Sequence, residues 1–377
     1  MVQRHPLGLG ATIFAKPRSY TTLPAVAAVS ILSFPFSAVA AEHNFSAGVW
    51  GTYAYLPDDD TSRDTWGSFE GEALILYANG EAEEGEGRWL YSAETRFGPG
   101  SFTDPENNST GDNFTLHQAW VGWRLGEQDI VRVGKSQVPF GWKTYNFWPG
   151  DILLAGFGDQ MDVGVKLSGS RDRWHYDAAL YLADDWGSTS TDTVDDNGHW
   201  GSSDTFRKTQ TWVGNLEYEF VQDHRIGLSL QSGQLQDLTG LGDNKTDGEH
   251  RAAVLHYQGS FGDFYTKASL ITNERELPPL YQQSAGLANK IENTRYALEL
   301  GYDHGPWSYY IDLSAAEPDT ESSMAGGVHA IAPGFRYNYG PGWVYVEYLS
   351  QNGGIDRNGQ VVEGDFDALY ITLDFYL

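Results

Sequence analysis

"RWLYSAETRF", residues 88–97, alternates between two kinds of side chain. One set, mostly apolar and aromatic, comprises Trp89, Tyr91, Ala93, Thr95 and Phe97. The polar set comprises Arg88, Ser92, Glu94 and Arg96. Successive side chains of a β-strand point to opposite faces, so a period of two indicates a strand with one apolar and one polar side.

The same alternation recurs along most of the chain. It is clear in "RWHYDAALYLA" (173–183), "TWVGNLEYEF" (211–220), "TRYALELGYD" (294–303) and "LYITLDFYL" (369–377). The composition also favours sheet, because 14% of residues are aromatic and there are 44 Gly. The alternation predicts sixteen strands, near 44–55, 67–80, 87–97, 113–125, 129–137, 162–168, 173–183, 209–221, 224–232, 250–258, 262–272, 294–302, 306–315, 329–338, 342–350 and 366–377.

Short and long connections alternate between these strands. The short ones are 126–129, 169–172, 222–224, 260–263, 303–306 and 339–342, with a slightly longer turn near 81–86. The long ones are 56–66, 98–112, 138–161, 184–208, 233–249, 273–293, 316–328 and 351–365. A soluble sandwich has no reason to place every long loop at one end, whereas a transmembrane barrel does. The sequence therefore predicts one antiparallel outer-membrane β-barrel of about sixteen strands over 41–377, with short periplasmic turns and long external loops.

The first forty residues predict export. They contain Arg4, Lys16 and Arg18 but no acid, then the apolar run "LPAVAAVSILSFPF" (23–36), and small residues follow. This order is typical of a signal peptide over 1–40, cleaved after Ala40 or Ala41. A transmembrane helix is the alternative, but Pro24 and Pro35 interrupt the apolar run. The chain has no Cys, so the exported protein forms no disulfide and carries no lipid anchor on cysteine.

Charge is distributed unevenly between loops and strands. The leader holds three of the 24 basic residues and no acid, so the mature chain has 21 basic and 51 acidic residues, a net charge of −30. Acids concentrate in the long loops, which predicts a negative external rim. Strand parity turns nine bases inward, namely Arg88, Arg96, Arg124, Arg132, Lys166, Arg225, Lys267, Arg295 and Arg336, among inward acids such as Glu94, Asp162 and Glu299. The lumen is thus mixed in sign, and the acidic balance excludes a nucleic-acid partner.

Aromatic residues cluster near the predicted strand ends. The examples are Trp50, Tyr53, Tyr55, Trp120, Trp123, Trp343, Tyr345, Phe375 and Tyr376. Outer-membrane barrels carry girdles of aromatic residues at both membrane interfaces, so these positions predict such girdles. The alternative is that they are ordinary core aromatics.

Two stretches, "VRVGKSQVPFGWK" (131–143) and "DVGVKLSG" (162–169), resemble motifs of the phosphate-selective porin-like family of sixteen-stranded outer-membrane porins. The matching residues are Val133, Gly134, Pro139, Phe140 and Gly141 in the first stretch, and Gly164 and Val165 in the second. Two positions depart from the family pattern. Asp162 stands where a basic residue is often found, and the chain ends in Leu377 rather than Phe or Trp.

The resemblance implies a homotrimer with one pore per subunit and a third long loop folded into the barrel. Here that loop is 138–161, which is rich in apolar residues such as Phe140, Phe147 and Trp148. A loop this apolar is costly to leave in water, so it either folds into the lumen or packs at a trimer interface.

The inward charges suggest a constriction. Arg88, Arg96, Arg132 and Lys166 come from the third to sixth strands, beside the loop that carries Asp151 and Asp159. We predict a transverse field between these bases and acids; the alternative is that lumen bases and acids simply pair. The full set of predicted pore residues is Arg88, Arg96, Arg132, Lys143, Asp151, Asp159, Asp162, Lys166, Arg295 and Arg336. Lys135 falls on the lipid side unless Gly134 forms a bulge.

No hydrolase, zinc-protease or phosphate-cradling motif occurs, so we expect no catalytic residue, no cofactor and no metal site. "DTVDDNG" (192–198) lacks the spacing of a calcium loop. The sequence predicts a Gram-negative outer-membrane channel for small hydrophilic solutes and ions, anions such as phosphate among them, in contact with lipid and lipopolysaccharide. The bases are too dispersed for phosphate specificity. The alternatives are an outer-membrane hydrolase and an adhesive or structural barrel with a closed lumen.

Overall fold

The computed structural model describes residues 42–81, 88–101, 113–141, 147, 160–184, 205–241, 243–321 and 323–377. The predicted signal peptide and the predicted pore residues Lys143, Asp151 and Asp159 lie outside these ranges. No helix within them is long and apolar enough to cross a membrane.

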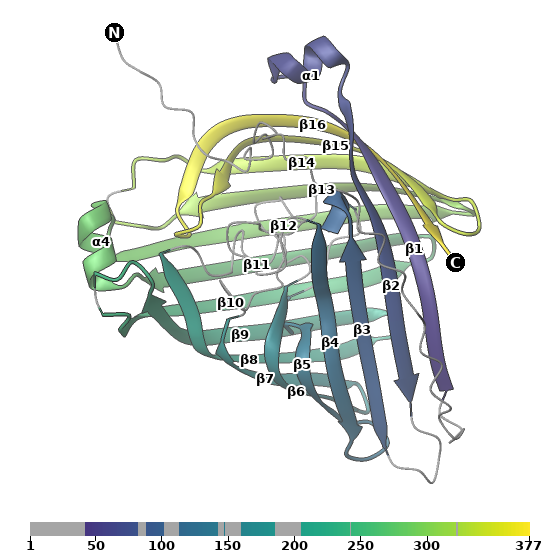
Figure 1. The fold of residues 1–377 in the computed structure, drawn as a ribbon, viewed down its shortest axis with the longest axis horizontal. Coiled ribbons are helices and arrows are strands. Elements are labelled where there is room, and N and C mark those ends of the chain that lie inside the picture. The colour runs from purple at the N-terminus through teal and green to yellow at the C-terminus, as the bar shows by residue number, and fades with distance from the viewer. Residues whose placement is uncertain are drawn as a thin grey trace, which may run out of the picture.

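The chain forms a closed antiparallel barrel in which each strand pairs with its neighbours in sequence (Figure 1). The strands are β1 (Glu42–Tyr55), β2 (Ser68–Glu81), β3 (Trp89–Phe97), β4 (Phe114–Arg124), β5 (Ile130–Gln137), β6 (Met161–Arg171), β7 (Trp174–Ala183), β8 (Phe206–Val221), β9 (His224–Asp237), β10 (Thr246–Phe261), β11 (Phe264–Glu276), β12 (Lys290–His304), β13 (Trp307–Pro318), β14 (Val328–Asn338), β15 (Trp343–Ile355) and β16 (Val361–Tyr376). The predicted sixteen-stranded barrel is confirmed.

The barrel closes where β1 pairs with β16. Their register runs from Gly48 opposite Tyr376 to Tyr55 opposite Leu369. A membrane interior offers no water to unpaired backbone groups, so a sheet can cross it only when its two edges meet. Pairing of the two ends of the chain therefore completes the structure.

Burial follows the period of two and puts polar residues inside. In β3, Leu90, Ser92, Glu94 and Arg96 are buried, whereas Trp89 on the other face is 53% exposed. The same inversion holds in β12, where Arg295 and Glu299 are fully buried and Tyr296 and Leu298 are exposed. A soluble sandwich would bury its apolar face, so this arrangement is that of a membrane barrel.

Turns at the periplasmic end are tight. A residue with a positive φ stands in five of them, namely Asp172, Asp223, Gly262, Gly305 and Gly340. Glycine and aspartate tolerate this backbone region better than most residues. The long connections lie at the opposite end and include the short helices α1 (Asp60–Thr65) and α4 (Pro279–Ala285) and the 3₁₀ turn η1 (Pro99–Ser101).

Several strands extend further toward the external end than the sequence pattern predicted. β9 reaches Asp237 rather than 232, β11 reaches Glu276 rather than 272, and β16 begins at Val361 rather than 366. Lipid imposes the apolar alternation only along the membrane-embedded part of a strand. Above the lipid both faces are polar, so the pattern disappears while backbone pairing continues.

The aromatic girdle is confirmed at the periplasmic end. Outward-facing pairs lie there next to the short turns, with ring centroids 4.5 Å apart for Trp89 and Trp123 and 4.6 Å apart for Trp174 and Tyr218. The assignment of Trp50, Trp120, Trp343 and Tyr345 to the girdle was wrong. These four share the parity of the lumen side, and each contacts an inward arginine or the inward loop. Trp50 lies under Arg96, Trp120 under Arg132, Trp343 under Arg336, and Tyr345 against Phe147.

Gly134 interrupts the regular parity of β5. Its φ is +124°, and Lys135, which simple alternation placed toward lipid, is only 4% exposed. A Cβ at Gly134 would lie 2.3 Å from the carbonyl oxygen of Ala119 on β4. Only glycine fits this backbone geometry, which removes a lysine charge from the lipid-facing surface.

Gly134→Ala should destabilise the barrel by at least about 1–3 kcal/mol, because the side chain adds backbone strain and a clash with β4. Urea unfolding in detergent, followed by tryptophan fluorescence, measures the change. Gly51→Ala in β1 is the matched control, since no atom lies within 4 Å of a Cβ built there. Equal unfolding midpoints for the two variants would contradict the assignment.

Candidate pore constriction

The described part of the third long loop begins against the lumen wall formed by β7 to β11. Val138 and Phe140 are buried in a cluster with inward residues that include Tyr181, Val213 and Ile271. The backbone N–H of Gly141 donates to Ser229 Oγ on β9 at 3.1 Å. The loop therefore enters the barrel as soon as β5 ends.

Phe147 lies against the opposite wall. Its N–H donates to Glu347 Oε1 on β15 at 2.7 Å. Its ring centroid lies 5.0 Å from that of Trp50 on β1 and 5.2 Å from that of Tyr345 on β15. Gly141 thus lies at the β9 wall and Phe147 at the wall of β15 and β1. For the described residues of the loop, the predicted inward fold is confirmed and the trimer-interface alternative is wrong.

Glu347 anchors this crossing. Its side chain is 1% exposed and its Oε1 also accepts a hydrogen bond from the Tyr310 hydroxyl at 2.6 Å. A buried carboxylate is stable only when such donors satisfy it. Glu347 was not among the predicted pore residues. Parity turns it inward, but nothing in the sequence connects it with residue 147.

Arg132 and Lys166 form a basic pair on the lumen wall. They are direct cross-strand partners of β5 and β6. Arg132 Nη1 donates to Ser168 Oγ at 2.8 Å and its guanidinium lies 5.0 Å from the Trp120 ring centre. Lys166 Nζ donates to the Gln137 carbonyl at 2.6 Å. Within the described part of the chain neither forms a salt bridge, although both interact electrostatically with Asp177 on β7. Two positive charges and one nearby carboxylate therefore lie on this wall.

The other predicted pore residues are placed differently. Arg96 pairs with Glu94 at 2.8 Å, so for this residue the pairing alternative holds. Asp162 is buried and accepts from the Val163 N–H, and Arg88 is exposed at the periplasmic end of β3. Arg295 is fully buried on β12, and Arg336 stacks 4.3 Å above Trp343 on β15. The structure brings Arg132 and Lys166 together on β5 and β6, whereas Arg96, Arg295 and Arg336 lie on other strands, β3, β12 and β14.

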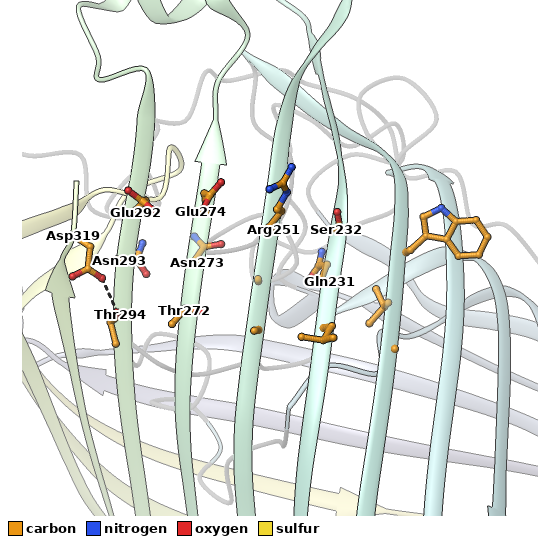
Figure 2. A pocket seen from close by; sticks show the side chains of 16 residues that line it. Gln231, Ser232, Arg251, Thr272, Asn273, Glu274, Glu292, Asn293, Thr294 and Asp319 are labelled. Carbon is orange, nitrogen blue, oxygen red and sulfur yellow. Dashed lines mark hydrogen bonds between the residues drawn. The ribbon is translucent and has the colours of Figure 1, made fainter. Parts of the chain in front are cut away.

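A concavity of about 720 Å³ spans the external ends of β8 to β13 (Figure 2). Its exposed members, such as Trp212 and Arg251, have outward parity, so it opens on the outside of the barrel. Small residues, Gly214 and Ala253 among them, form part of its lining. Charged residues lie above them, with Lys290 bridging Glu274 at 2.9 Å and Glu292 at 2.7 Å.

Residues 46–214, which run from β1 to β8, match the family described as phosphate-selective porin O and P. The chain is a Gram-negative outer-membrane β-barrel whose first eight strands are similar to this family. The resemblance predicted from the two motif stretches is thereby confirmed. No curated protein matches the chain.

Solved structures of other proteins share the fold at low sequence identity. OmpT of Vibrio cholerae is 11% identical, with a TM-score of 0.60 over 91% of this chain and 99% of that chain. The anion-selective porin from Comamonas acidovorans is 12% identical, with a TM-score of 0.58 over 89% and 100%. OmpF of Salmonella typhi, in complex with daunomycin, is 10% identical, with a TM-score of 0.62 over 89% and 97%. These likenesses show the sixteen-stranded fold.

Arg132→Ala should lower the anion-to-cation permeability ratio several-fold. A unit charge about 6 Å from a passing ion contributes about 0.7–3 kcal/mol at an effective dielectric constant between 80 and 20. Reversal potentials across a salt gradient in planar bilayers measure the ratio. The control is Arg207→Ala, which removes the same charge from the external end of β8. Arg207 lies on the face opposite buried Phe206 and Lys208. An unchanged ion preference in Arg132→Ala would refute a selective role for the basic pair.

Proposed function

We propose that the chain is a porin whose water-filled lumen lets small hydrophilic solutes and ions diffuse across the outer membrane. The observation that carries this proposal is the polar lumen wall crossed by the loop at Phe147. A polar interior admits water and solutes, and an inward loop leaves a passage narrower than the barrel. The match to the porin family supports the same function.

The channel is weakly selective rather than specific for phosphate. The basic pair of Arg132 and Lys166 favours anions at its level of the lumen. This preference is modest, because Asp177 lies near the pair and other lumen bases face acids, as in the Lys267–Glu299 ion pair at 2.9 Å. A dedicated phosphate path needs a dense run of unopposed bases, so the mixed wall supports a broad range of small polar solutes.

The barrel works without catalysis and as a homotrimer. Solved relatives include a trimer form of OmpT of Vibrio cholerae, which supports three pores per assembly. Residues 1–40 direct export and are removed, which leaves a mature barrel domain from residue 41. Of the two alternative functions, a hydrolase would cleave lipid or peptide when purified, and a closed structural barrel would carry no current.

Lipopolysaccharide is the proposed lipid partner at the concavity over β8 to β13. Its small residues leave room for an acyl chain at the upper edge of the apolar surface. Arg251, which is paired with Glu249 at 2.8 Å, stands where a phosphorylated head group would lie. Acidic neighbours such as Glu274 and Glu292 can share divalent cations with the same phosphates.

Purified protein in planar bilayers should give stepwise conductance that rises with salt concentration. A panel of chloride, phosphate, potassium and small sugars should show passage of all four classes with modest differences, because the lumen carries both signs of charge. Bilayer currents measure the ions and liposome swelling measures the sugars. Absence of current together with hydrolysis of lipid or peptide would replace the porin with the hydrolase.

Ala253→Trp and Arg251→Glu should each reduce the lipopolysaccharide retained by the purified barrel. The first fills the concavity and the second reverses the charge beside the head group. Native mass spectrometry of protein extracted in mild detergent counts the bound molecules. Val121→Trp, on the exposed outer face of β4, is the control for added bulk. Retention equal to that of wild type in both variants would reject this site.

A further inference from the structure

The hairpin that joins β15 to β16 bends over the external end of the barrel. Its register shifts between Gln351 and Gly353, where a bulge increases the local bend. A Cβ at Gly353 would lie 2.3 Å from Val328 Cγ1 on β14, so only glycine allows this close approach. The external ends of both strands curve across toward the side of the barrel that carries α4 (Figure 1).

The stem of the hairpin rests on an apolar part of the lumen wall. Ile355 and Val361, each 5% exposed, belong to a buried cluster with Ala316, Val328 and Leu349. A lumen wall in contact with water alone would be polar at these positions, so the apolar residues indicate that the hairpin covers them. The cluster fixes the hairpin on the inner side of β13 to β16, because lifting it would expose these side chains.

The tip of the hairpin then bonds to elements that lie further around the barrel. Arg275 Nη1 on β11 donates to the Arg357 carbonyl at 2.7 Å, and Asn293 Nδ2 on β12 donates to the Gly359 carbonyl at 2.6 Å. The Tyr281 hydroxyl on α4 donates to Asn358 Oδ1 at 2.9 Å. In the barrel order, β13 and β14 separate β15 from β12, so the tip reaches across both.

The tip is held in one shape by its own bonds. The Asp356 carboxylate accepts the N–H groups of Asn358 at 2.9 Å and Gln360 at 2.8 Å, and the Asp356 N–H donates to the Gln360 carbonyl at 2.9 Å. The Asp356 carboxylate also interacts electrostatically with Arg275. A turn ordered in this way loses little further entropy when it is latched.

We propose that residues 355–361 form a cap that limits the size of solutes entering from outside, latched by Arg275, Asn293 and Tyr281. The cap is a second restriction, separate from the loop that crosses the lumen at Phe147. This proposal rests on the proposed channel function. It identifies the segment that selects solutes by size at the external mouth. Arg275 acts here as a positioning residue, since it holds the tip rather than the solute.

The test compares the wild-type barrel with two variants. The double substitution Arg275→Ala, Asn293→Ala removes two of the three latch bonds. The second variant replaces residues 356–360 by Asn-Gly, which shortens the hairpin and leaves the barrel wall intact. Arg207→Ala on β8 is the control for loss of one arginine at the external end. Slower migration of each protein after heating in a denaturing gel verifies that the barrel was folded.

Liposome swelling with mono-, di-, tri- and tetrasaccharides gives the size limit, and single-channel recording gives the conductance. Both variants should admit larger sugars than wild type and conduct more current, with the control unchanged.

A wild-type barrel that passes small sugars, with the same size limit and conductance in both variants, would overturn the cap and leave the channel function standing. Absence of conductance from wild type and both variants would overturn the channel function itself. A closed wild type with an open shortened variant would support the cap.

Discussion

Closure of the sheet is the constraint on which the rest of the structure depends. An unpaired backbone group in hydrocarbon costs several kcal/mol, so β1 must pair with β16 before any barrel is stable in the membrane. Their eight paired positions, from Gly48 to Tyr55, join two strands from opposite ends of the chain. Closure also fixes which side of every strand faces lipid, and the period of two in the sequence follows from it.

The interior of the closed barrel must be occupied either by protein segments or by water. Two segments from the external loops enter it at different places. The loop after β5 is held by Glu347 through the N–H of Phe147, and the hairpin between β15 and β16 is held by Arg275 and Asn293. In both cases a buried polar side chain of the wall binds loop backbone. Charged groups inside the lumen thus position the chain as well as contact solutes.

Much of the fold could be predicted from the sequence because the lipid boundary leaves a pattern in it. The apolar alternation stops at the edge of the lipid. The external extensions of strands such as β9 and β16 therefore could not be predicted from it. Trp50 and Trp120 were wrongly predicted to belong to the girdle because they lie near strand ends. Their strand parity, which places both side chains inward, was the better guide. The basic pair at Arg132 and Lys166 was predictable from parity and adjacent strands. The contact of Phe147 with Glu347 was not, because it joins residues 200 positions apart through a loop without periodicity.

The central claim is that Phe147 lies inside the lumen, between β1 and β15. The chain contains no Cys, so Phe147→Cys introduces a single thiol. A charged thiol reagent added to the open channel should reduce its current, while the same reagent on Phe45→Cys, at an exposed outward position, should leave the current unchanged. Complete labelling of Phe147→Cys, verified by mass spectrometry, with no change in current would contradict the account.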